Sequence, residues 1–250
     1  SADTKGAKNV AIGQGALEAQ NFTSATDSYN TAVGHFAGGS ITTGVENTLI
    51  GGLAGDAITT GVSNTGVGKS SVGATTTGDF NTAVGHGALL KNTTADNNVG
   101  VGYQALADNT TGAGNTAVGT FAGANITTAN NNTALGMNSL KINTTGAFNT
   151  ALGRQALLSN TTGANNVAVG GNALYQITTA SDNTAVGAYA LDADTLGSRS
   201  TAVGTAALST QNFTSATNTY NTAVGYYAGA AVTTGDNNTL VGGNTGDVLT

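Results

Sequence analysis

The sequence predicts an all-β fold, a β-solenoid (parallel β-roll) of about 14 stacked coils. Two observations predict the coils. The phrase Asn-Thr-Ala-Val-Gly, or a close variant, occurs fourteen times, and its closing glycines follow one another at a spacing of 17 in eleven of thirteen intervals and of 21 in two. A short, fixed period is typical of solenoids, in which each repeat completes the core of its neighbours. A third observation excludes helices, because Gly, Thr, Asn and Val dominate and no 3.6-residue apolar stripe is present.

The repeated phrase itself predicts one strand in each coil. The residue before the closing glycine is aliphatic in all fourteen coils and is mostly β-branched, as in Val84, Val101 and Val118. We expect these residues to form a buried column. The residue before them, Ala in most coils, points to the opposite face. Because that face is so small, we expect the backbone of another subunit to lie against it.

The remainder of each coil predicts a second strand and two turns. Ala and then Leu or Gly follow the closing glycine, and a Thr-Thr pair such as Thr42-Thr43 marks the second straight segment. Gly or Ala with Asn or Asp closes the coil, and these residues suit turns with positive φ. The Asn that opens the phrase, replaced only by Ser200 from Asn30 onward, predicts a ladder of side-chain hydrogen bonds between coils stacked about 4.8 Å apart.

A longer period lies over the short one. Residues 2–56 match residues 193–247 at an offset of 191, which equals ten coils of 17 and one of 21. The sequence therefore predicts one repeat array over residues 1–250, with one super-repeat at 2–192 and the start of the next at 193–250. Neither end resembles the polar cap that solenoids need, so we expect end-to-end continuation or cover by another domain or subunit.

Composition argues against several functions. The net charge is −6 without a basic run, which argues against nucleic-acid binding. No apolar stretch reaches the length of about 18 residues that predicts membrane insertion. The chain has no Cys, and its two His residues, His35 and His86, lie three coils apart without an acidic pair nearby. We therefore predict no enzyme activity, no cofactor and no metal site.

The residues resemble a known family. Asn-Thr-Ala-Val-Gly-x-x-Ala-Leu, with Asn-Val-Ala-Ile-Gly at 9–13, resembles the head repeats of YadA-type trimeric autotransporter adhesins, and the phrase with Thr-Thr-Gly resembles repeats of phage tail-fibre-like proteins. The resemblance covers the whole chain, although the family's head repeats are usually a little shorter than the repeats of this chain. It implies a left-handed β-roll, a homotrimer, an extracellular location on a cell surface or virion fibre, and a role in attachment.

The candidate contact residues lie at two places in the repeat. The two positions after each closing glycine vary most, which predicts an exposed row of aromatic anchors for sugars or proteins, or alternatively turn residues and fillers between subunits. The two 21-residue coils add a predicted protruding loop, or alternatively an insertion that relieves twist. The candidates are His35, Phe36, Tyr103, Phe121, Tyr189, Tyr226 and Tyr227 in the row, and Phe22 and Phe213 in the longer coils.

These observations favour an adhesive surface fibre that attaches to a host cell or other surface through an unknown glycan or protein receptor. The alternative is a purely structural filament or spacer, with recognition in other domains. A minor alternative is an ice-binding solenoid rich in Thr. Neighbouring residues of each Thr-Thr pair point to opposite sides, which weakens that alternative because only one reaches a flat face.

Overall fold

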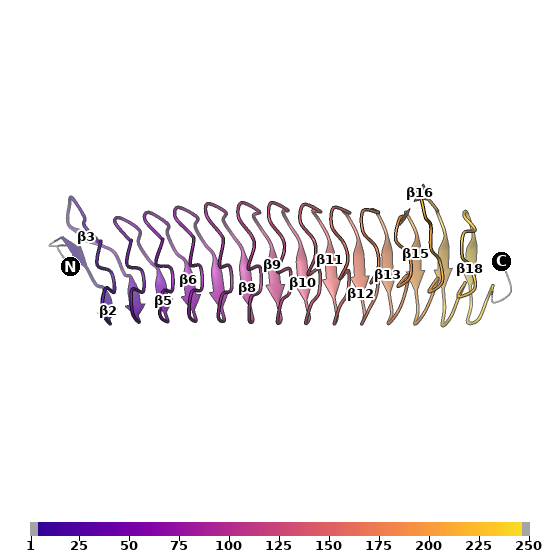
Figure 1. Cartoon of the computed structure of the whole chain (residues 1–250), viewed down its shortest axis with the longest axis horizontal. Helices are drawn as coiled ribbons and strands as arrows, with labels where there is room; N and C mark the ends of the chain where they lie inside the picture. Colours follow the sequence, from indigo (N-terminus) through magenta and orange to yellow (C-terminus); the bar gives the residue numbers. More distant parts are fainter. Residues whose placement is uncertain (1–4, 247–250) are drawn as a thin grey trace. The chain divides into compact units, whose positions relative to one another are not determined.

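The predicted all-β solenoid is confirmed. The computed structural model describes residues 5–246, which contain strands and tight turns but no helix. These residues form about 14 coils of a solenoid, spaced as the sequence repeat predicts. The chain divides into two compact units, Ser1–Thr128 and Ala129–Thr250. Each unit is a stack of coils with one short strand of the main sheet per coil (Figure 1).

The first unit pairs its main strands in parallel at the repeat period. Val67 pairs with Val84, Val84 with Val101, and Val101 with Val118, so the predicted stacking of this column is confirmed. Its strands are β1 (Gly6–Ala7), β2 (Val10–Ile12), β3 (Thr26–Asp27), β4 (Thr31–Val33), β5 (Thr48–Ile50), β6 (Thr65–Val67), β7 (Thr82–Val84), β8 (Val99–Val101) and β9 (Thr116–Val118).

The second unit repeats this arrangement. Leu135 pairs with Leu152, Leu152 with Val169, and Val169 with Val186. Its strands are β10 (Thr133–Leu135), β11 (Thr150–Leu152), β12 (Val167–Val169), β13 (Thr184–Val186), β14 (Gly197–Ser198), β15 (Thr201–Val203), β16 (Thr217–Asn218), β17 (Thr222–Val224) and β18 (Thr239–Val241).

The prediction of two strands in every coil was wrong. The Thr-Thr segments form bends, because the backbone N–H groups of Thr42, Thr43 and Gly44 all converge on the carbonyl of Thr59, at 2.9, 3.3 and 3.3 Å. Three donors on one acceptor curl the chain, whereas a strand would spread its bonds over alternate residues. A second short strand accompanies each 21-residue coil, where β1 pairs with β3 and β14 with β16.

The prediction of which face of the strand lies in the interior was also wrong. The Ala column faces the interior, and Ala32, Ala83 and Ala117 are 0% exposed, while Ile50 and Val84 on the other face are 40% and 37% exposed. Leu and Ile side chains enter the same interior from the rest of the coil, so the inward strand position is mostly Ala, with Leu49 as a buried exception. The small face is therefore the core of the coil, and the aliphatic column is its outer surface.

The predicted Asn ladder is confirmed and is buried. In the first unit, Oδ1 of Asn64 accepts the backbone N–H of Asn81 at 3.0 Å and its Nδ2 group at 3.1 Å, so neighbouring coils are joined. Nδ2 of Asn64 donates across its own coil to the carbonyl of Gly78 at 2.8 Å. One carboxamide thus holds a coil closed and fixes its distance from the next coil.

The interior fills in two alternative ways that keep its volume nearly constant. In most coils Leu at the inner turn accompanies Asn three residues later, whereas Gly at that turn accompanies Ile, so a large residue faces a smaller one. The Leu–Asn coils include Leu89–Asn92, Leu106–Asn109, Leu140–Asn143 and Leu157–Asn160, and the Gly–Ile coils include Gly38–Ile41, Gly55–Ile58 and Gly123–Ile126. Leu174–Ile177 and Val72–Thr75 depart from this pattern.

This alternation explains two buried oxygen atoms without partners. Nδ2 of Asn109 donates to Oδ1 of Asn92 at 2.9 Å, which forms a second short ladder. The equivalent residue in the following coil is Ile126, so Oδ1 of Asn109 has no donor. Oδ1 of Asn160 is unpaired for the same reason, because Ile177 follows it. Each ladder ends where the core changes from one filling to the other.

Replacing Asn64 by Ala is expected to lower the free energy of unfolding by about 2–5 kcal/mol, because the buried N–H of Asn81 and the carbonyl of Gly78 both lose their partner. Denaturant unfolding measures the change. The control is Thr77→Ala at an exposed position of the same coil, with an expected change within about 0.5 kcal/mol. Equal effects of the two substitutions would contradict the role of the ladder.

The two substitutions that exchange one core filling for the other are expected to have strongly non-additive effects on the free energy of unfolding. Gly123→Leu alone overpacks the interior, since a Cβ atom at Gly123 lies 3.0 Å from Leu106 and 3.1 Å from Ile126, and it costs about 1–3 kcal/mol. Ile126→Asn alone leaves space and costs about 2–5 kcal/mol. Together they recreate a Leu–Asn coil and supply a donor to Oδ1 of Asn109. The double variant should lose at least about 1 kcal/mol less than the sum, and additive losses would refute this packing rule.

Candidate functional site

The outer face of the main sheet is an apolar surface in both units. The Thr or Val that begins each strand of the main sheet and the aliphatic residue that ends it point outward, and neither position carries a charge in any described coil. Exposed members of the aliphatic column include Ile50 and Val84 in the first unit, and Leu135, Leu152, Val186 and Val224 in the second. We call these outward Thr and aliphatic positions the outer sheet face. Contiguous apolar surface is a common feature of interaction sites.

The predicted aromatic row exists, and its rings contact one another. Tyr103, Tyr189, Tyr226 and Tyr227 are 40–60% exposed, His35 is exposed, and Phe36 and Phe121 are half-buried. In the first unit, the His86 and Tyr103 rings stack with centroids 5.5 Å apart, and Tyr103 meets Phe121 edge to face at 5.2 Å. His35–Phe36 and Tyr226–Tyr227 are further pairs, at 4.6 and 4.5 Å.

These ring contacts limit what the row can bind. A sugar that stacks on an aromatic side chain needs an open ring face. One face of Tyr103 lies against His86, and Phe121 contacts it at nearly a right angle, so part of this ring is covered by its neighbours. Tyr189 is half exposed and belongs to no described ring pair, whereas the more exposed Tyr226 contacts Tyr227.

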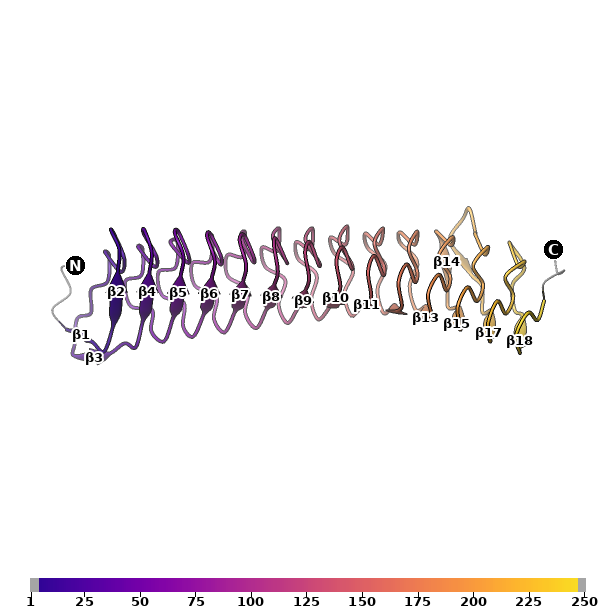
Figure 2. The same cartoon turned by 90° about the horizontal axis from the view of Figure 1, so that it is seen from below.

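The prediction that Phe22 and Phe213 are surface contacts was wrong. Both side chains are 7% exposed. The N–H of Phe213 points at Oδ1 of Asp194 at 3.5 Å, and its carbonyl accepts the hydroxyl of Thr195 at 3.0 Å, so the longer coil folds back over its own phenyl ring. Residues 214–216 after it are exposed, and the loop stands out beyond the neighbouring turns of its unit (Figures 1 and 2).

A second row of exposed aromatic residues was not predicted. It occupies the position just before the ladder Asn, where the chain turns with positive φ. Phe80 and Phe148 are 57% and 60% exposed at φ of 57° and 58°, and Tyr29 and Tyr220 are about half exposed at the same address. Most coils place Asn, Asp, Ser or another small or polar residue there. A bulky residue with positive φ is strained, so its presence at an exposed corner favours a contact role.

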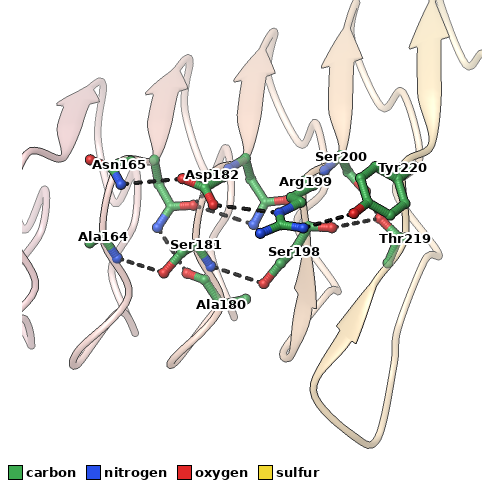
Figure 3. Close-up of polar contacts among 12 residues, drawn as sticks. Ala164, Asn165, Ala180, Ser181, Asp182, Ser198, Arg199, Ser200, Thr219 and Tyr220 are labelled. Carbon is green, nitrogen blue, oxygen red and sulfur yellow. Dashed lines mark hydrogen bonds and ion pairs between the residues drawn. The ribbon is translucent and has the colours of Figure 1, made fainter.

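The same corner carries a chain of polar contacts in the second unit (Figure 3). Nδ2 of Asn165 donates to Asp182 at 3.2 Å, and the guanidinium of Arg199 lies 3.7 Å from the other oxygen of Asp182. Nη1 of Arg199 then donates to the hydroxyl of Tyr220 at 2.7 Å. The guanidinium is therefore held between a carboxylate and a phenol on successive coils.

The first unit has the same cation–tyrosine pair one super-repeat earlier. Nζ of Lys8 lies 2.6 Å from Asp27 and 2.8 Å from the hydroxyl of Tyr29. Hydrogen bonds to Asp27 and then Tyr29 raise the pKa of Lys8. Lys8 and Tyr29 correspond to Arg199 and Tyr220 at the offset of 191. Each 21-residue coil is thus closed by a cation and a tyrosine.

The described residues contain no cluster of metal-ligating side chains. Over residues 5–246, no three His, Asp or Glu side chains gather closely enough to hold an ion. The same residues contain no helix with the length and apolarity to cross a membrane. Comparisons with protein-family models, with curated proteins and with solved structures found no match to this chain.

Replacing Asp192 by Asn is expected to stabilise the protein at neutral pH. Oδ1 of Asp192 is buried without a partner, and burial raises the pKa of this carboxyl above 3.8, opposed by backbone N–H groups. The folded state therefore binds its proton more tightly than the unfolded state, so stability is full below pH 3.8 and falls as pH rises through the folded-state pKa. Solvent screening keeps the gain at pH 7 below about 1 kcal/mol.

Thermal unfolding at pH 7 and at pH 3 measures this effect. Asp192→Asn should raise the midpoint at pH 7 only, because both residues are uncharged at the lower pH. Asp236→Asn at an exposed turn is the control, with little change expected at either pH. A gain of equal size at both pH values would point to packing and not to charge.

Proposed function

We propose that this chain is a segment of an adhesive surface fibre. Copies of it associate through the outer sheet face, and the remaining surfaces are presented for attachment. One observation carries the proposal: every described coil places an uncharged Thr or Val and an aliphatic residue outward, in register with the next coil. Soluble monomers rarely expose large contiguous apolar surface, and this face carries no charge.

Self-association suits the thin interior of the coil. In most coils the strand contributes only an Ala methyl group to the core, and its larger aliphatic side chain remains outside. Burial of that surface stabilises at roughly 25 cal/mol per Å². A second copy has the same spacing of aliphatic residues, so its columns match those of the first. Three copies are proposed from the resemblance to trimeric adhesin heads.

The adhesive role is supported by the corners of the coils. Aromatic and charged side chains recur at fixed addresses, as with Phe80, Tyr103 and Tyr189, and they are exposed. Repeated weak contacts along one molecule raise the total affinity without any single strong site. The proposed location is outside the cell or on a virion, where such fibres act.

A structural spacer is the second candidate, and the ring contacts favour it. His86, Tyr103 and Phe121 use much of their surface on one another, which stabilises the stack but leaves less for a receptor. The ice-binding alternative gains no support from the Thr pairs. The hydroxyl groups of Thr42, Thr59 and Thr76 donate to Thr carbonyls of the next coil, at 3.1–3.2 Å, and are not free.

Mass measurement in solution tests self-association. The wild-type chain is expected to be a trimer at micromolar concentration, and Val84→Asp with Val101→Asp should dissociate it, because buried charges oppose association. Thr94→Asp at an exposed turn of the coil that contains Val84 is the control and should keep the wild-type mass. A compact wild-type monomer would refute the proposed interface.

Binding to arrays of glycans and matrix proteins separates the adhesive fibre from the spacer. An adhesive fibre is expected to bind, and its binding should weaken when Phe80 and Tyr189 are replaced by Ser, while the mass stays unchanged. A trimer that binds nothing on either array would favour the spacer.

A further inference from the structure

The first unit contains a hollow that interrupts the regular surface of its coils. Its volume is about 340 Å³, and it spans three successive coils, with Leu53 and Asp56 on one side and Leu90 and Lys91 on the other. The middle coil forms the floor with Ser70, Gly73 and Ala74. Gly73 occupies the position in its coil that Asp56 and Leu90 occupy in the flanking coils. Because glycine has no side chain, a space remains there.

The carboxylate on the rim of the hollow has no cation beside it among the described residues. Lys91 also lines the hollow, but its Nζ atom pairs with Asp108 on the next coil at 2.8 Å. Asp56 is half-buried, and desolvation raises the pKa of its carboxyl, while its own backbone N–H acts in the opposite direction. A carboxylate partly removed from water and without a counter-ion is stabilised by a cation that enters the hollow.

The walls define the rest of the ligand. Leu53 and Leu90 are both partly exposed and face the hollow from opposite coils, which favours an unbranched apolar chain between them. The volume lies near the lower limit for small-molecule sites, enough for one side chain and too small for an oligosaccharide. A flexible methylene stem that ends in an ammonium group is the chemistry of lysine.

We propose that this hollow binds a lysine side chain of a partner protein, with its methylene groups between Leu53 and Leu90 and its ammonium group on the carboxylate of Asp56. The inference names the chemistry of the partner for the adhesive fibre and rests on that proposed function for its biological role. Binding of a lysine side chain to the hollow does not itself require self-association.

Titration of the 250-residue chain with Nα-acetyl-lysine methylamide, followed by NMR of labelled Leu methyl groups, tests the proposal. The methyl signals of Leu53 and Leu90 are expected to shift with saturable, millimolar affinity that falls at high salt. Nα-acetyl-norleucine methylamide has the same stem without the charge and should bind at least tenfold more weakly. Equal binding of the two probes would overturn the proposal.

Three variants locate the site. Asp56→Asn removes the charge, and Gly73→Leu fills the space with the residue of the next coil, so each should weaken lysine binding at least tenfold. Asp192→Asn is the matched control, because Asp192 has the same address in its coil and the same direction of pKa change but does not line the hollow. Binding that survives in Asp56→Asn, or is lost in Asp192→Asn, would refute the site.

The outcome can be separated from that of the proposed function. If the mass measurement gives a trimer and the arrays show attachment while the lysine probe does not bind, the hollow alone is refuted. If the probe binds to a chain that is monomeric, the hollow stands and the trimeric fibre falls.

Discussion

The buried Asn carboxamide that opens each coil is the interaction on which the rest of the structure depends. So short a coil has no helix and no hairpin to hold it closed, and its backbone groups need partners across the interior. Nδ2 of Asn64 reaches the carbonyl of Gly78 on the opposite wall, and Oδ1 binds the next coil. A buried amide without such partners costs about 1–3 kcal/mol, so the ladder favours a single register along the stack.

The ladder also explains why the apolar column lies outside. The distance that one Asn side chain can bridge fixes the two walls of the coil close together. Leu or Ile from the inner turn then fills most of the remaining space, and the strand can add only Ala, Gly or an occasional Leu, as at Leu49. Larger aliphatic residues on the strand must point away from the core. The same constraint that closes a coil thus produces the apolar face available for association.

Sequence periodicity was enough to predict the coil, the register of Val84 with Val101, and the ladder, because all three recur at the same short period. It could not show which face of the strand lies inside, since alternation identifies two faces but not the thickness of the interior. Phe80 was missed because the position before the ladder Asn is occupied by turn residues in most coils. The hollow was missed because it depends on Gly73 lying between Asp56 and Leu90, a neighbourhood created by stacking and invisible along the chain.

The 21-residue coils show that the array tolerates a longer repeat only with added polar contacts. In the second longer coil Ser200 replaces the ladder Asn, and Gln211 links this coil to both of its neighbours. Its Oε1 accepts from Asn221 at 2.8 Å, while its Nε2 donates to Ser200 at 3.0 Å and to the buried Asp194 at 2.5 Å. Gln20 and Asn30 form the equivalent bond at 3.3 Å in the first unit. The inner Gln and the outer cation–tyrosine pair recur together in both longer coils. Each longer coil is therefore a distinct structural element, stabilised by its own polar contacts and repeated with the 191-residue period.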